Sequence, residues 1–141
     1  MGIEFEPFKE FVCVGDTVEC QIGNLTFIAR IVQDNDYSID DDDSHNVDQS
    51  VTGCSDEQQK KLIAAREAFA RGEWFYCGIV VSVKFEDTVI AENAASLWAI
   101  EANYPESNNQ YLGEVANELL PEAVEVAKNE LEKLQQATLD G

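Results

Sequence analysis

Basic residues are scarce in this sequence. Its 141 residues include nine lysines and arginines against 28 aspartates and glutamates, which gives a formal net charge of −19. Such a charge repels nucleic-acid phosphates and anionic membrane surfaces, so it argues against direct binding to either. It favours a basic partner protein, cations or simple solubility. Apolar residues still make up 45% of the chain, enough for the core of one ordinary domain.

Long apolar runs are also missing. No stretch approaches the roughly 18 apolar residues of a transmembrane helix, so we predict none. The N-terminal sequence MGIEFEPFKEF lacks the basic and apolar regions of a signal peptide, and Glu6 stands where a myristoylation signal needs serine or threonine. The four cysteines form no C-x-x-C pair, and the strand pattern points Cys20 and Cys77 into the core. We therefore expect reduced thiols in a cytoplasmic protein, with no zinc site.

Catalytic motifs are absent too. The sequence has no nucleophile elbow, phosphate-binding loop or zincin motif, and His45 is its single histidine. Cys54 is the one candidate nucleophile, because it precedes a predicted helix N-terminus, a position that favours the thiolate. Asp56 and Glu57 in the first turn oppose that effect. We therefore predict a protein that is not an enzyme, with no catalytic residue and no cofactor.

Residues 12–33 predict a β-hairpin. Apolar side chains alternate on both sides of Gly23-Asn24, a pair typical of two-residue hairpin turns. Such a turn pairs Ile22 with Leu25, Cys20 with Phe27 and Val18 with Ala29. All three pairs then lie on one face, so the turn and the alternation predict the same register.

The next two segments read as a loop and a helix. Residues 34–53 are polar, carry seven aspartates, and predict an acidic loop of the length that is usually functional. A helix is expected to start at Ser55, where Ser55 and Gln58 form a capping-box pattern, and to end at Gly72.

The rest of the chain predicts a second hairpin and a long helix. Residues 74–92 alternate as two strands joined at Glu86-Asp87, and residues 93–102 read as either a short helix or a strand, with strand favoured. The C-terminal helix spans 109–136 and is interrupted at Pro121. Proline removes a backbone donor, so we expect either a kink or two abutting helices there. Together these elements predict a single α+β domain over residues 1–141, in the order ββ-α-ββ(β)-α. It consists of an antiparallel sheet of two hairpins, with four or five strands, a central helix and the long C-terminal helix packed on one face.

Aromatic residues are concentrated in the second half of the chain. We expect them to fill the interface between sheet and helices, with an exposed recognition patch as the alternative. The residues concerned are Trp74, Phe75, Tyr76, Trp98 and Tyr104.

Three phrases of the sequence carry a family resemblance: DDDDSHNVDQSVTGCSDEQQKKL, EWFYCGIVVSV and NAASLWAIEANYPESNNQYLGEVANELLPEA. They resemble an uncharacterised family of small acidic proteins encoded by phages, plasmids and integrating elements of proteobacteria. The resemblance covers roughly residues 10–130. It implies a bacterial host cytoplasm and a mobile-element setting, in which small acidic proteins act against host defence or manage DNA-binding proteins.

The acidic residues are distributed unevenly. No lysine or arginine stands between Arg30 and Lys60 or between Lys84 and Lys128, and each stretch holds nine acids. On the predicted C-terminal helix, five glutamates fall within about 80° of one another, opposite the apolar side, with neighbours roughly 5–6 Å apart along the axis. They are Glu114, Glu118, Glu122, Glu125 and Glu132, and we call them the glutamate stripe.

This distribution suggests a surface that a basic partner reads. At one charge per about 1.7 Å of duplex, 19 charges correspond to about 32 Å of DNA, close to the diameter of about 37 Å expected for the domain. We therefore predict an acidic binding protein, in its sharpest form a DNA-mimic-like inhibitor of a basic nucleic-acid-handling host protein. The plain alternative is that the acids form a solvated face. The predicted binding residues are the glutamate stripe together with Asp34, Asp36, Asp40, Asp41, Asp42, Asp43 and Asp48.

Two further interpretations stay open. Counting from Asp34, the loop matches several positions of an EF-hand, but Ile39 and His45 replace the required glycine and glutamate. We therefore expect only weak cation binding at Asp40–Asp43 and no dedicated metal site. The alternative function is a structural or assembly protein whose C-terminal helix pairs with a scaffold or forms a homodimer. The apolar residues for that pairing are Leu119, Leu120, Val124, Leu131 and Leu134.

Overall fold

The first hairpin forms with the predicted register. The structure is a computed structural model that describes residues 4–37, 56–105, 107 and 109–140. In it β1 (Thr17–Ile22) and β2 (Leu25–Gln33) pair antiparallel, with Ile22 opposite Leu25 and Cys20 opposite Phe27. Gly23 turns the chain with a φ of 60°, a left-handed conformation that glycine adopts without strain. The alternation seen in the sequence is therefore confirmed pair by pair.

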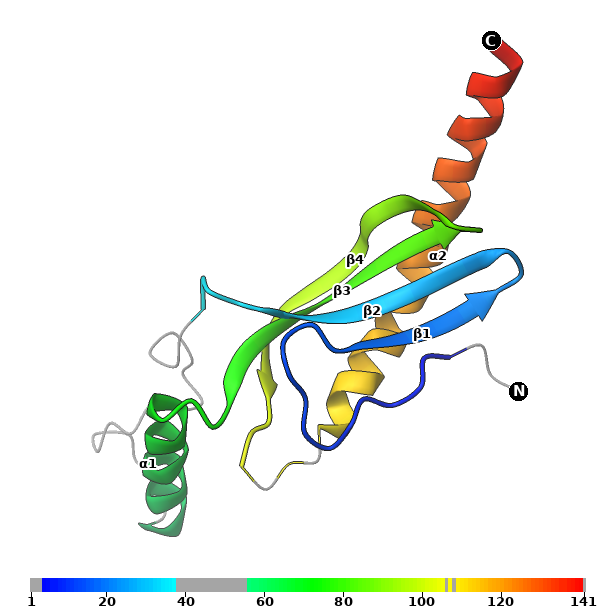
Figure 1. Cartoon of the computed structure of the whole chain (residues 1–141). Helices are drawn as coiled ribbons and strands as arrows, with labels where there is room; N and C mark the ends of the chain where they lie inside the picture. Colours follow the sequence, from blue (N-terminus) through cyan, green and yellow to red (C-terminus); the bar gives the residue numbers. More distant parts are fainter. Residues whose placement is uncertain (1–3, 38–55, 106, 108, 141) are drawn as a thin grey trace.

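The second hairpin completes a four-stranded antiparallel sheet in the order β1-β2-β3-β4. β3 (Phe75–Phe85) and β4 (Thr88–Ala102) are joined by Glu86-Asp87 (Figure 1). Residues 93–102 are strand, as favoured, but they continue β4, so the described sheet has no fifth strand. β4 has 15 residues against 11 in β3, and the four extra residues are taken up at three register shifts along the pair.

One long helix, α2 (Gln110–Asp140), lies across one face of this sheet (Figure 1). Its buried side faces β3 and β4 and consists of Leu112, Ala116, Leu119, Leu120, Ala123 and Ala127. The helix runs through Pro121 as one element, so the chain does not form two abutting helices there. Pro121 is exposed. Water can therefore bind the carbonyl that the missing N–H leaves unpaired, and packing of the apolar side holds the helix together.

The central helix, α1 (Asp56–Ala70), packs apart from α2. Its end is a Schellman motif as predicted from Gly72: Glu73 N donates to Ala68 O, Gly72 N donates to Phe69 O, and Gly72 has a φ of 77°. Ala68 and Phe69 contact Trp74 and Tyr76, which form a second, smaller cluster at the end of the sheet. The α+β class and element order are confirmed, and α1 extends the fold beyond the sheet (Figure 1).

The segment before β1 closes the core through a buried asparagine network. Asn109 is fully buried, and its Nδ2 donates to Glu10 O and to Asn103 Oδ1, both at 2.8 Å. Asn103 exchanges two bonds with the backbone of Val12, and both asparagines have a positive φ. Asparagine tolerates that conformation better than most residues. The network ties the N-terminal segment to the link between β4 and α2.

Candidate functional site

The glutamate stripe is exposed along its whole length. All five side chains are solvent-accessible and stand on the side of α2 opposite its buried residues. The helix geometry expected from the sequence therefore places them as a row. The ammonium group of Lys128 lies 3.7 Å from the carboxylate of Glu125, with both side chains well exposed. An exposed pair of this kind neutralises little of the surrounding charge.

The described part of the acidic loop does not join that row. Asp34 is half-buried at the end of β2, where its carboxylate accepts bonds from Asp36 N at 3.0 Å and Ala99 N at 2.9 Å. Asp34 N bonds to Tyr76 O, so Asp34 stands opposite Tyr76, one position past the pair of Gln33 with Cys77. Alternation along the strand puts its side chain on the sheet face away from α2. Asp34 thus holds β4 in place, and Asp36 is exposed beside it.

The other loop positions cannot be placed against the stripe. Asp40, Asp41, Asp42, Asp43 and Asp48, together with His45 and Cys54, lie outside the described residues. Within the described ranges, no group of three or more histidine, cysteine, aspartate or glutamate side chains is arranged to hold a metal ion.

Tertiary structure brings one of the two base-free stretches into a single surface. Residues 85–127 contain no lysine or arginine and form β4 and the first half of α2, which pack against each other. Among the described acids of this stretch, Glu101 is half-buried and the rest are exposed. Four of the nine basic residues gather instead in and just after α1, at Lys60, Lys61, Arg66 and Arg71. The charged side chains of β4 and the first half of α2 are therefore all acidic, and we call the exposed part of these two elements the acidic β4–α2 surface.

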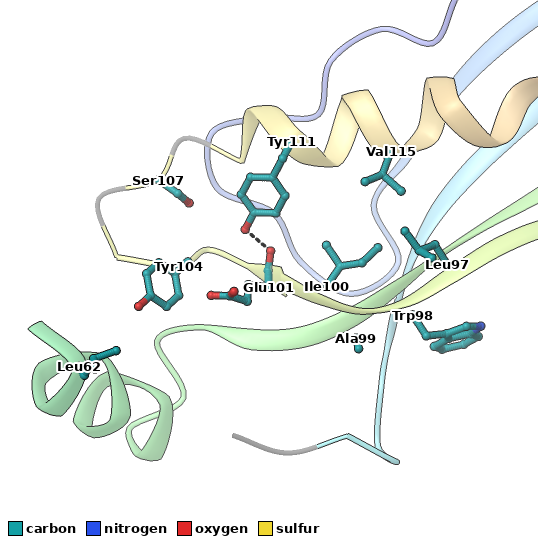
Figure 2. A pocket seen from close by; sticks show the side chains of 10 residues that line it. All are labelled: Leu62, Leu97, Trp98, Ala99, Ile100, Glu101, Tyr104, Ser107, Tyr111 and Val115. Atoms are coloured by element: carbon teal, nitrogen blue, oxygen red, sulfur yellow. Dashed lines mark hydrogen bonds between the residues drawn. The ribbon is translucent and has the colours of Figure 1, made fainter. Parts of the chain in front are cut away.

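A cleft of about 620 Å³ opens in this surface, along β4 and the start of α2 (Figure 2). Its walls are mostly apolar and aromatic, and among the described residues that line it Glu101 is the one carboxylate. Figure 2 shows Glu101 on β4, in the part of the cleft that Tyr104 and Tyr111 also line. The lining residues are Leu62, Leu97, Trp98, Ala99, Ile100, Glu101, Tyr104, Ser107, Tyr111 and Val115.

Tyr111 fixes one wall of the cleft. Its hydroxyl donates to the carbonyl of Glu101 on the outer edge of β4. Burial raises the pKa of Tyr111 to about 12, and the nearby charge of Glu101 acts in the same direction. Tyr111 is therefore a neutral donor at physiological pH. The Ser107 Oγ atom is itself buried and meets the geometry of no hydrogen bond within the described structure.

Trp98 forms the other end of the cleft and is 43% exposed, which overturns the expectation that all five aromatics fill the interior. Trp74 and Tyr76 follow that expectation, since both are buried against α1. The difference comes from a register shift in β4 between Leu97 and Ile100, where Ala99 has a φ of 61°. Such a bulge re-aims neighbouring side chains, and it leaves Leu97 and Trp98 both exposed at the sheet edge.

The described cysteines are structural. Cys20 and Cys77 are buried, as the strand pattern predicted, and Cys13 is exposed and free. Burial raises the pKa of Cys77 to about 12, with a further contribution from the charge of Asp34, so its thiol is held in the unreactive neutral form.

Comparison with protein-family models, with curated proteins and with solved structures finds no match to this chain. In the part of the chain that the structure describes, no helix is long and apolar enough to cross a membrane. The site must therefore be interpreted from its own chemistry. Sequence reasoning located the glutamate stripe and missed the cleft. Glu101 and Tyr111 come from different elements, and only the absence of bases between Lys84 and Lys128 pointed towards them.

Proposed function

We propose that this protein is a non-enzymatic acidic binding protein whose partner is a basic protein. The observation that supports this best is the β4–α2 surface, where adjacent elements expose carboxylates and contain no lysine or arginine between residues 85 and 127. A surface with one sign of charge steers a partner of opposite sign and repels phosphate. Nucleic acid and anionic membrane therefore remain poor partners.

The sharper form of the proposal is DNA mimicry. From Glu114 to Glu132 the stripe rises about 27 Å, since a helix rises about 1.5 Å per residue. Five charges over that length stand on average about 6.8 Å apart, against about 3.4 Å along a single DNA strand. The stripe alone thus reaches about half of the charge density of one strand. A basic groove that binds a phosphate row could accept it, and the other acids of the surface add to it.

The resemblance noted above supports the biological setting of this proposal. Proteins of mobile elements meet host enzymes that bind DNA through basic surfaces. An acidic surface that occupies such a site would act as an inhibitor in the cytoplasm of a bacterial host, as an anti-defence protein does.

A pair of charge-matched variants tests the proposal. The first replaces the five glutamates of the stripe by glutamine, which keeps side-chain shape and has a similar helix propensity. The second replaces five exposed glutamates elsewhere, at Glu4, Glu6, Glu10, Glu19 and Glu67. Both variants have a net charge of −14, because each loses five negative charges from −19.

Each protein is immobilised and exposed to a proteobacterial lysate at low salt, and the bound proteins are identified and eluted with rising salt. We expect the unchanged protein and the control variant to retain the same basic proteins, and the stripe variant to lose them. The Debye screening length falls to about 3 Å at 1 M salt, so the bound proteins should elute below that concentration. Equal retention by both variants, or retention that salt does not disturb, would contradict the proposal.

The second candidate function is assembly through the end of α2. Beyond Ala127 none of the described side chains of the helix is buried, yet Leu131 and Leu134 continue its apolar side and Leu134 is 50% exposed. The helix projects past the sheet there (Figure 1). Light scattering over a wide range of protein concentrations separates the two functions, because a strict monomer rules out a homodimer.

A further inference from the structure

The cleft between β4 and α2 combines three properties that rarely meet on a surface by chance. It has apolar walls from Leu97 and Val115, aromatic rings at several positions, and a carboxylate at Glu101. None of the described residues that line it is a lysine or an arginine. Clefts of this kind, mostly apolar with a few convergent polar groups, are the usual form of a side-chain or ligand site.

The walls also connect the cleft to the glutamate stripe. Tyr111 and Val115 line it from α2, and Glu118 and Glu122 follow at spacings of three and four residues on the same side of the helix. A chain segment that leaves the cleft along α2 therefore meets exposed carboxylates. Whatever enters is attracted by negative charge both inside the cleft and at its exit.

Strand addition to the free edge of β4 is a poor fit. The carbonyl of Glu101, which an added strand would need, is already taken by the hydroxyl of Tyr111. Three register shifts break the regular spacing of β4 along its pair with β3. Bulges of this kind protect a sheet edge from pairing with another chain. Recognition at the cleft must therefore proceed through side chains.

We propose that this cleft binds an arginine side chain from an extended segment of the basic partner. The guanidinium group lies against the carboxylate of Glu101 and stacks on the aromatic rings that line the same cleft. Arginine fits better than lysine, because its planar group both stacks on rings and bonds a carboxylate at two points. The inference rests on the proposed function and names arginine as the partner residue that makes the binding specific.

Two peptides of equal charge test the inference on the full chain, hexaarginine and hexalysine, with a hexamer of citrulline as the uncharged analogue of arginine. Binding is followed through tryptophan fluorescence, which reports on the cleft because Trp98 is 43% exposed and Trp74 is 1% exposed. We expect hexaarginine to bind about fivefold more tightly than hexalysine, from a stacking advantage of about 1 kcal/mol. It should also protect Trp98 from quenching by acrylamide.

Two single-charge variants locate the preference. Glu101→Gln keeps the shape of the cleft and removes its negative charge. Glu114→Gln removes one negative charge from α2, at an exposed residue that does not line the cleft. We expect Glu101→Gln to bring the arginine-to-lysine ratio close to one, and Glu114→Gln to weaken both peptides equally while keeping the ratio. Trp98→Leu, which preserves an apolar side chain, should also lower the ratio, measured by titration calorimetry because this variant lacks the reporting tryptophan.

The outcomes separate this inference from the proposed function. Equal binding of hexaarginine and hexalysine, with both weakened by loss of the glutamate stripe, leaves the acidic binding function standing and overturns the cleft assignment. Tight binding of the citrulline hexamer also overturns it, because the occupant would then be an apolar segment. Failure of both charged peptides to bind at low salt overturns both ideas.

Discussion

Adding a single methyl group at Gly78 should displace Trp98. Gly78 lies in β3, and a Cβ atom built there would stand 2.3 Å from Cε3 of Trp98 and 2.6 Å from its Cδ2. Ordinary contacts between carbons begin near 3.5 Å, so the ring must move by more than 1 Å. β3 is paired on both sides and cannot shift easily, whereas Trp98 stands at the sheet edge. Gly78→Ala should therefore push the indole ring towards solvent.

The cost follows from the area that the ring loses. Trp98 is 43% exposed, so slightly more than half of it is covered. An aromatic side chain buries about 150–250 Å² when fully enclosed, so roughly 100 Å² is at stake. At about 25 cal/mol per Å² this corresponds to at most about 2.5 kcal/mol. Alanine is better than glycine in a strand by about 0.5–1 kcal/mol, so we expect a net loss of about 1–2 kcal/mol.

A double-mutant cycle with Trp98→Ala measures this effect. Urea unfolding followed by circular dichroism gives the free energy of unfolding of each protein. In the Trp98→Ala background the methyl group meets no ring, so Gly78→Ala should be neutral or slightly stabilising. Fluorescence of the single variant should shift to the red, because Trp74 stays buried. An equal cost of Gly78→Ala in both backgrounds would refute the reasoning.

Three further changes probe the fold. Asn109→Asp should lower the free energy of unfolding by about 2–4 kcal/mol in urea titrations, because it removes both buried donors, to Glu10 O and Asn103 Oδ1; a loss below about 1 kcal/mol would contradict the network. Gly113→Ala should raise Tm and stabilise α2 by about 0.5–1 kcal/mol, since the added Cβ meets only ordinary contacts from 3.5 Å outwards; destabilisation would show that the N-terminal segment packs more tightly. Burial raises the pKa of Cys77 to about 12 in the folded protein, whereas the thiol of the unfolded chain ionises near 9. Between these two pH values only the unfolded chain loses the proton, so the free energy of unfolding should fall as pH rises from about 9 towards 12. Unfolding measured against pH should show a smaller alkaline loss in Cys77→Ala, and an unchanged slope would contradict the burial of a neutral thiol.

Local patterns predicted the parts of the fold that local rules control. The first hairpin followed because a two-residue turn and strict alternation allow one register, which the pair of Cys20 and Phe27 confirms. The end of α1 could be predicted because helices often end at a residue in the left-handed conformation, which glycine adopts without strain, and Gly72 does so here. At Pro121 the same reasoning left a kink or two abutting helices open, and the structure has a single helix there. Its missing hydrogen bond is a local cost, and the packing of α2 on the sheet outweighs it.

Other features depended on partners far away in the chain. The exposure of Trp98 could not be predicted, because it follows from how β4 slips against β3, which no periodicity within β4 reveals. The asparagine network was missed for a related reason. In the sequence Asn103 and Asn109 resemble ordinary loop residues, and only the path of the N-terminal segment makes them a buried junction.

The sequence by itself determined the net charge, the two base-free stretches and the row of glutamates, because charge is additive and helix geometry alone sets which residues share a side. Only the tertiary structure decided which acids act together. Packing of α2 against β4 joins one base-free stretch into a surface with a cleft at Glu101. Pairing of β2 with β3 turns Asp34 to the opposite face, where its carboxylate holds the bulge at Ala99. Neighbours in space come from long-range pairing, and a one-dimensional pattern does not contain them.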